Sequence, residues 1–263
     1  MSGLWQRVAQ KRSSGRFSLL RASGLLAALL LCWGLLSVWS VTTADISTAG
    51  RRDCVSVAFA AQKPAAAAGE QRVREVIDGD TLRLDSGVVV RLKEIDAPEL
   101  GHGKAPDQYY AQQARDGLRA LSLGRGIRLE TGVVSADRYG RVLACAYGAD
   151  GRCLNEVLLE QGLAVYYPHP GQPSPLSGRL LGAQVSAMDR GAGFWATMLR
   201  RPEMKQPCVG NSRSLRFFPA GCRFGNAIRR SGRVAFASAE QAFRAGYAPA
   251  RPCGFWPLAD AVR

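Results

Sequence analysis

Two carboxylates, an arginine and a third acid lie close together in the stretch VREVIDGDTLRLDSGVVVRLKEIDAPE, residues 73–99. The carboxylates are Asp80 and Asp96, the arginine is Arg91 and the third acid is Glu99. Carboxylates in proteins hold hard cations, and guanidinium groups hold phosphate. These residue types together therefore predict a site for metal-assisted hydrolysis of a phosphodiester.

A second cluster, DRYGR at residues 137–141, adds Arg141, which can be aimed at the same place. A phosphodiester is anionic, so water attacks it only after negative charge is neutralised, which one divalent cation and two guanidinium groups can do. Each motif also has a simpler interpretation, because DGDT or DRYG alone can be an ordinary turn and Arg91 alone a solvated strand residue. Because all of these charged positions are filled together, the sequence favours a phosphodiester-hydrolysing site over ordinary turns and a solvated strand residue.

An oxygen-only donor set prefers calcium or magnesium over zinc. The chain has only two histidines, His102 and His169, and neither lies in these motifs. A histidine-based mechanism and a zinc cofactor are therefore not expected.

The spacing of apolar residues predicts the elements that must position these groups. Strands are expected at residues 72–77, 81–85, 88–95, 127–134 and 141–147. Helices are expected at about 108–123, 155–161 and 176–190. Three strands, a helix, two strands and then helices suit a small closed barrel. The predicted fold class is mainly β with α, an OB-type five-stranded antiparallel β-barrel with three helices.

Five motifs between residue 72 and about residue 198 resemble the staphylococcal nuclease (thermonuclease) family. In the family's order they are IDGDTLRL (77–84), VRLKEIDAPE (90–99), DRYGRVLA (137–144), LNEVLLEQGLA (154–164) and GAGFWA (191–196). A single DGDT would be a weak signal, but five motifs in order are specific. The resemblance implies an OB barrel with three helices and hydrolysis of DNA or RNA, with calcium as cofactor and 3′-phosphate ends as product.

The resemblance also implies which residues bind the metal and activate water. Asp80 and Asp96 supply carboxylate oxygens to one calcium ion, and residue 97 supplies its main-chain carbonyl. The family's archetype has threonine there, and Ala97 offers the same main-chain oxygen. Glu99 is the implied general base.

The remaining matches concern the substrate and the surroundings of the metal. Arg91 and Arg141 are implied to hold the scissile phosphate. The nucleotide pocket is implied to contain Arg138 and Tyr139, with a further aromatic face from Tyr166 or Tyr167, and the groups around the metal are implied to be Asp78 and Thr81.

The net charge of +14 is unevenly distributed along the chain. Residues 1–23 carry five basic and no acidic side chains, and residues 71–200 carry sixteen basic and fifteen acidic ones. Residues 201–263 carry eleven basic and three acidic ones. Basic residues before an apolar run are a membrane-orientation signal, and a basic tail suggests a polyanionic partner.

Residues 1–44 are expected to be a signal-anchor or a signal peptide, because no charged side chain occurs from Ala22 to Ala44. This run is long enough to cross a bilayer. Its length favours an uncleaved anchor, while small-x-small triplets near residues 42–44 and 58–60 fit cleavage, and a buried helix remains a third interpretation. Either export route places the remainder in the cell envelope, or outside it if the segment is cleaved.

Six cysteines follow the apolar run, and an even number in an exported chain permits disulfides. Cys145 and Cys153 flank a predicted turn, so a bridge between them is possible if the register places them opposite each other. The alternative is that both are small apolar fillers.

Residues 205–263 are expected to form a small basic module, after the nuclease-like domain at 71–200 and a linker at 45–70. The stretches VGNSRS, FFPAGCR, RVAFAS and AGYAPARPC resemble the metal-binding module of Ada-type DNA repair proteins. That module has four metal ligands, but Ala250 replaces a cysteine and Phe218 a histidine. A disulfide between Cys222 and Cys253 in place of the metal is therefore expected, with free thiols or a poor metal site as the alternatives.

The sequence thus predicts a membrane-anchored or exported calcium-dependent nuclease with little sequence specificity. Its expected partners are DNA or RNA and, through the N-terminal segment, a membrane. No heptad or self-complementary stripe is present, so a monomer is expected. The alternative is a catalytically inactive OB-fold protein that only binds nucleic acid, with the basic tail as a grip or as a solubilising segment.

Overall fold

The structure, a computed structural model, describes residues 69–169 and 174–262 of the 263-residue chain. All of them belong to one compact unit, Phe59–Arg263. The apolar run at residues 22–44 lies outside the described residues, as does most of the predicted linker. Among the described helices, none is long and apolar enough to cross a membrane.

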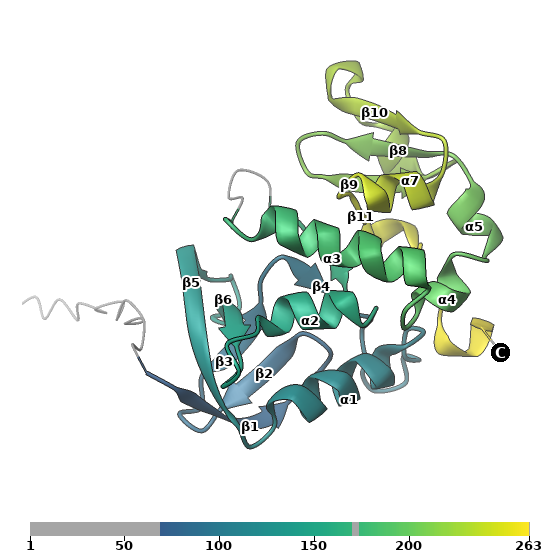
Figure 1. Cartoon of the computed structure of the whole chain (residues 1–263). Coiled ribbons are helices and arrows are strands. Elements are labelled where there is room, and N and C mark those ends of the chain that lie inside the picture. The colour runs from purple at the N-terminus through teal and green to yellow at the C-terminus, as the bar shows by residue number, and fades with distance from the viewer. Residues whose placement is uncertain (1–68, 170–173, 263) are drawn as a thin grey trace, which may run out of the picture. The chain divides into compact units, whose positions relative to one another are not determined.

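The described residues form a mixed α and β fold (Figure 1). The strands are β1 (Gln71–Val76), β2 (Thr81–Leu84), β3 (Val89–Leu92), β4 (Ile95–Asp96), β5 (Gly126–Ala136), β6 (Val142–Tyr147), β7 (Val165–Tyr166), β8 (Cys208–Asn211), β9 (Arg216–Pro219), β10 (Arg233–Phe236) and β11 (Ala248–Pro249). The α-helices are α1 (Ala111–Ser122), α2 (Leu154–Glu160), α3 (Ser177–Arg190), α4 (Trp195–Met198), α5 (Pro202–Lys205), α6 (Arg223–Asn226) and α7 (Ala239–Arg244). Short 3₁₀ helices are η1 (Arg230–Gly232), η2 (Arg251–Cys253) and η3 (Ala259–Val262).

Five strands close into a barrel in the order β1-β2-β3-β6-β5. The neighbours β1–β2, β2–β3, β5–β6 and β1–β5 pair antiparallel, but β3 and β6 pair parallel. The prediction of a wholly antiparallel barrel is therefore wrong at this one pair. The reason is topological: α1 and β5 separate β3 from β6, and a crossover of this length allows parallel pairing, which a tight hairpin does not.

The predicted third strand, 88–95, is in fact two strands separated by a turn. Glu94 adopts a left-handed backbone with a φ of 59°, which interrupts the extended run between β3 and β4. Its side chain is buried, and its Oε2 accepts a 2.6 Å hydrogen bond from Ser177 at the start of α3. β4 then pairs with β7 rather than with the barrel, with Asp96 opposite Val165.

The barrel core follows the alternation of apolar residues that predicted its strands. Leu82, Leu84, Val90 and Leu92 are fully or almost fully buried, because alternate residues of β2 and β3 face the same interior. Leu118 of α1 joins this core, as the three- and four-residue spacing of that helix's apolar residues predicts.

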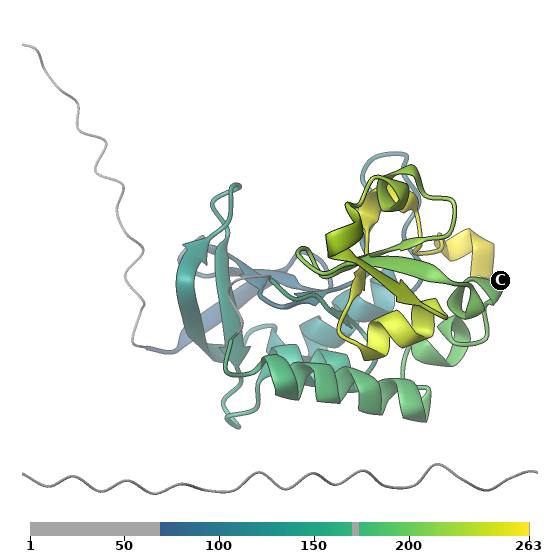
Figure 2. The same ribbon diagram turned by 90° about the horizontal axis from the view of Figure 1, so that it is seen from above.

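The C-terminal residues form a second sheet, in the order β10-β8-β9-β11, which lies next to α3 in both views (Figures 1 and 2). Helix α7 is capped by Ser238, whose hydroxyl accepts a hydrogen bond from the Gln241 amide. The second hydrophobic core is shared between the two regions. The Trp195 ring of α4 lies 5.1 Å from the Phe243 ring of α7, so the C-terminal sheet is packed against the barrel's helices.

Candidate active site

Arg91 on β3 is the centre of the acidic cluster. Its Nη2 lies 3.0 Å from Asp80 Oδ2 and 2.8 Å from Asp96 Oδ1. Its Nη1 donates to the main-chain carbonyls of Leu92 and Ile95, at 2.6 and 2.8 Å. Burial lowers the pKa of Arg91, but the two carboxylates outweigh this effect and raise it above the ordinary value. The guanidinium therefore stays charged and holds both acids in place.

Asp80 is positioned by the turn between β1 and β2. Its Oδ1 accepts a hydrogen bond from the Thr81 hydroxyl at 3.0 Å, and its Oδ2 accepts one from the Ala97 amide at 2.8 Å. Asp78 supports the same turn, because its Oδ1 accepts from the Asp80 amide at 3.0 Å. Burial raises the pKa of Asp80 above the ordinary value, although Arg91 lowers it, so a further cation beside this carboxylate would be favoured.

Gly79 allows this turn to pack closely. A Cβ atom at Gly79 would lie 2.6 Å from the Cβ of Ala97 and 2.7 Å from the Cβ of Ala114 in α1. Both distances are shorter than carbon atoms tolerate. The glycine therefore lets the turn that carries Asp80 sit directly against Ala97 and the helix.

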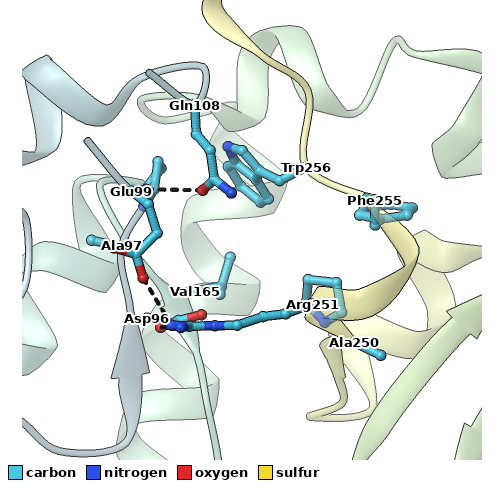
Figure 3. A pocket seen from close by; sticks show the side chains of 12 residues that line it. Asp96, Ala97, Glu99, Gln108, Val165, Ala250, Arg251, Phe255 and Trp256 are labelled. Atoms are coloured by element: carbon cyan, nitrogen blue, oxygen red, sulfur yellow. Dashed lines mark hydrogen bonds and ion pairs between the residues drawn. The ribbon is translucent and has the colours of Figure 1, made fainter. Parts of the chain in front are cut away.

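Glu99 and Asp96 are joined by an arginine that the sequence analysis did not identify. The Nη2 atom of Arg251 lies 2.7 Å from Asp96 Oδ1 and 2.9 Å from Glu99 Oε1. Figure 3 shows this side chain reaching from the C-terminal segment to Asp96. Burial raises the pKa of Glu99, and Arg251 opposes that rise. Nothing in the spacing of the sequence indicates this contact, because 155 positions separate Arg251 from Asp96.

Asp96 and Glu99 face a cavity of about 140 Å³ between the barrel and the C-terminal segment. Asp96, Ala97 and Glu99 line it from the barrel, and Arg251 and Trp256 line it from the other side (Figure 3). The C-terminal residues therefore form part of the wall of the candidate site.

The structure does not bring Arg141 into contact with these acids. Its Nε donates a hydrogen bond to Asp137 Oδ2 at 2.7 Å. This contact is the ion pair that Arg141 makes within the described residues. In the parallel register Arg91 pairs with Leu143, so alternation places Arg141 on the same face of the sheet as Arg91. Arg141 thus lies on the correct face but is held by its own turn.

The residues predicted to bind a nucleotide occupy different environments. Tyr139 is 68% exposed, and the Arg138 guanidinium carbon lies 4.7 Å from its ring centroid. Tyr166 is buried in the barrel core and presents no open face. Tyr167 lines a second cavity, where the Arg216 guanidinium carbon lies 3.3 Å from its ring centroid. Of the two tyrosines that the sequence left open, Tyr167 is the one that lines a cavity.

Of the two cysteine pairs considered from the sequence, one forms a disulfide and the other does not. Cys222 and Cys253 form a disulfide in the structure. Cys145 and Cys153 are free and buried, so the possible bridge between them is not formed. The two thiols are nevertheless close enough to hydrogen-bond to each other.

The donor atoms at the site fit a hard divalent cation. Asp80 and Asp96 converge on the same Arg91 nitrogen, and Ala97 lines the cavity beside them. Carboxylate and carbonyl oxygens are the ligands that calcium and magnesium prefer. No group of three or more His, Cys, Asp or Glu side chains within residues 69–169 and 174–262 could hold a metal. Asp80 and Asp96 are therefore the carboxylates that this site offers to a cation.

Comparison with known proteins extends this description. Residues 89–197 match the family model described as Staphylococcal nuclease homologue. The match includes Arg91, Asp96, Glu99 and Arg141, whereas Asp80 precedes it and is brought to Arg91 by the β1–β2 turn. Residues 205–263 lie outside the match, so the resemblance to the Ada-type module stays a prediction.

Among the relatives are the succinoglycan biosynthesis protein ExoI of Rhizobium meliloti (34% identical, covering 46% of this chain and 61% of that protein) and an uncharacterised endonuclease of Escherichia coli (35% identical, covering 36% and 60%). The thermonuclease of Staphylococcus hyicus is 34% identical, with 35% of this chain and 56% of that protein covered. The chain thus spans about three-fifths of the length of the first two relatives. Residues 89–197 are thus similar to staphylococcal nuclease homologues, and two of these relatives are named as an endonuclease and a thermonuclease.

Proposed function

We propose that this protein is a calcium-dependent nuclease that hydrolyses phosphodiester bonds in DNA or RNA with little sequence specificity. The observation that supports this most is the convergence of Asp80 and Asp96 on Arg91, beside Glu99 and an open cavity. The similarity of residues 89–197 to nuclease homologues adds to it. Guanidinium groups and a cation bind backbone phosphate rather than base edges, so little sequence preference follows.

Each residue has a role in this reaction. Asp80, Asp96 and the Ala97 carbonyl would hold the cation, and bound calcium would supply positive charge against the phosphate oxygens. Arg91 balances the two carboxylates and faces the substrate phosphate. Glu99 accepts a proton from the attacking water as the water oxygen bonds to phosphorus and the bond to the 5′ oxygen breaks, and solvent water protonates the departing 5′ oxygen.

Two arginines must move for this reaction to proceed. Arg251 pairs with both Asp96 and Glu99, so cation binding and proton uptake both require that it leave them. Its side chain is 60% exposed, which allows it to turn into solvent. Arg141 must exchange Asp137 for the substrate phosphate, and its side chain is already partly exposed.

Digestion of single-stranded DNA with calcium, and then with a chelator, tests the proposal. Asp96→Asn removes one metal ligand and is expected to lower kcat by about 10²–10³. Glu75→Gln is the matched control, because Glu75 pairs with Arg83 on the barrel surface, away from the site. Activity that persists unchanged in chelator or in Asp96→Asn would refute the metal site. Salt-dependent binding without any product would favour the inactive nucleic-acid-binding alternative.

We also propose that the catalytic region is exported, either anchored by residues 22–44 or released by cleavage. The basic residues before that run support the orientation, and a Cys222–Cys253 disulfide suits an oxidising compartment. The mass of the mature protein, measured with and without reduction, tests both. A mass equal to that of the full-length chain, together with recovery of the protein in the soluble cytoplasmic fraction, would contradict export.

A further inference from the structure

A second cavity, of about 470 Å³, opens between Tyr167 of the barrel region and the C-terminal sheet. We call it the flanking hollow. The side chains that line it include Tyr167, Arg216, Phe218, Phe224, Ile228 and Arg251. Nothing in the family match covers its C-terminal wall, which begins beyond residue 197.

The hollow combines fixed positive charge with aromatic surface. Arg216 stacks on the Tyr167 ring, and its guanidinium also donates to the main-chain carbonyls of Pro168 and Leu215, at 3.1 and 3.2 Å. This cation is therefore held in one position. Phe224 is 42% exposed, which is unusual for a phenylalanine, and the Arg223 guanidinium carbon lies 4.7 Å from its ring centroid.

Close packing of helix α6 against strand β9 fixes the position of Phe224. A Cβ atom at the neighbouring Gly225 would lie 2.9 Å from the Cβ of Phe218, so helix α6 packs directly on β9. Cys222 precedes this helix and is joined to Cys253 near Arg251. The exposed ring is thus presented by a braced segment rather than by a free loop.

The hollow adjoins the candidate active site. Ala250 and Arg251 line both cavities, so the Arg251 side chain lies between the acidic cluster and the hollow. No acidic side chain lines the hollow. The C-terminal region that forms this wall also carries exposed arginines, at positions 213, 223, 229, 230 and 233.

Positive charge beside exposed aromatic rings matches one class of ligand. Single-stranded nucleic acid offers phosphates for the arginines and open base faces for the rings, whereas the bases of a duplex are stacked on each other and cannot use the rings. We propose that the flanking hollow binds a base of a single-stranded substrate next to the scissile phosphate, so that the C-terminal region extends the substrate groove. This inference rests on the proposed nuclease function.

Kinetics on two substrates test it. A single-stranded DNA oligonucleotide reaches both cavities, whereas a nitrophenyl ester of a single nucleotide reaches only the active site. Phe224→Ala is expected to raise KM for the oligonucleotide about tenfold, within the range that loss of one base–aromatic stack produces, and to leave kcat and the ester unchanged. Phe224→Tyr, which keeps a ring, should retain the wild-type KM.

The control is Val88→Ala, which truncates another exposed apolar side chain, on the β2–β3 turn. An unchanged oligonucleotide KM in Phe224→Ala, or an equal loss on both substrates, would overturn the inference. Failure of the wild-type protein to cleave either substrate would instead contradict the proposed function. Direct binding still tests the hollow in that case. Single-stranded DNA should bind more tightly than duplex DNA, and Phe224→Ala should weaken the binding of single-stranded DNA about tenfold. Any other result would show that the hollow is not a base site.

Discussion

Arg91 and Arg251 approach the same oxygen of Asp96 from two regions of the molecule, at 2.8 and 2.7 Å. Arg91 belongs to the barrel, is 11% exposed and also binds two main-chain carbonyls. Arg251 belongs to the C-terminal segment, is 60% exposed, and its ion pairs are with carboxylates. Almost equal distances therefore conceal different roles. Burial makes Arg91 a permanent part of the site, while exposure leaves Arg251 displaceable.

The largest effect is expected for Arg91→Ala. Removing one partner of a buried ion pair leaves the Asp80 carboxylate without its counter-charge, which typically costs about 3–5 kcal/mol. Denaturant unfolding measures the loss. Arg83→Ala is the control, because it removes an exposed pair with Glu75 and should cost less than about 1 kcal/mol. Similar losses for the two variants would remove the distinction between the two arginines.

Removal of the disulfide tests how Arg251 is held. Cys222 and Cys253 are 31 positions apart, and a cross-link of this kind typically contributes about 2–4 kcal/mol. The double variant Cys222→Ser with Cys253→Ser should therefore lower the free energy of unfolding by that amount. Reductant should reproduce the loss in the wild-type protein and have no further effect on the double variant. An effect of reductant on the double variant would assign the stability to another group.

The side chain of Arg141 is 31% exposed, which lies between the exposed fractions of Arg91 and Arg251. Burial raises the pKa of its partner Asp137, but hydrogen bonds from Arg141 and Tyr139 outweigh this and hold it below the ordinary value. A lowered pKa stabilises the fold above the unfolded-state pKa of about 4 and loses that stability as the pH falls through the folded-state pKa.

Asp137→Asn should therefore lower the free energy of unfolding at pH 7 by about 1–2 kcal/mol. The difference from the wild-type protein should shrink as the pH falls below about 4. Urea unfolding at several pH values measures this, and a difference that grows in acid would contradict the assignment.

The smallest change in stability is expected for Arg251→Ala, less than about 1 kcal/mol, because its pairs are largely exposed. Its effect on metal binding should have the opposite sign. Without a competing guanidinium at Asp96, half-maximal cleavage of a nucleotide ester should need several-fold less calcium, while Arg251→Lys should remain close to the wild-type protein. A higher calcium requirement in Arg251→Ala would show that Arg251 helps the cation rather than competing with it.

The sequence predicted the parts of this site that depend on local pattern. Strands and helices follow the spacing of apolar residues, so β2 and α1 lie within a few residues of their predicted ranges. The break at Glu94 was not predicted, because a left-handed non-glycine residue leaves no local signal. The contact of Arg251 with Asp96 was not predicted either, because it depends on how the C-terminal sheet packs. Cys145 and Cys153 lie within hydrogen-bonding reach of each other yet stay unbridged, and their spacing in the sequence left both outcomes open.

The close packing at Gly79 offers a way to separate chemistry from charge. A single methyl group there would act as a wedge between the loop of the first acid and the helix behind it. It would push Asp80 away from the Ala97 amide while leaving every ionisable group of the protein in place. Such a variant would keep the molecule's attraction for a polyanion but lose the alignment needed to cut it, and would report on capture alone.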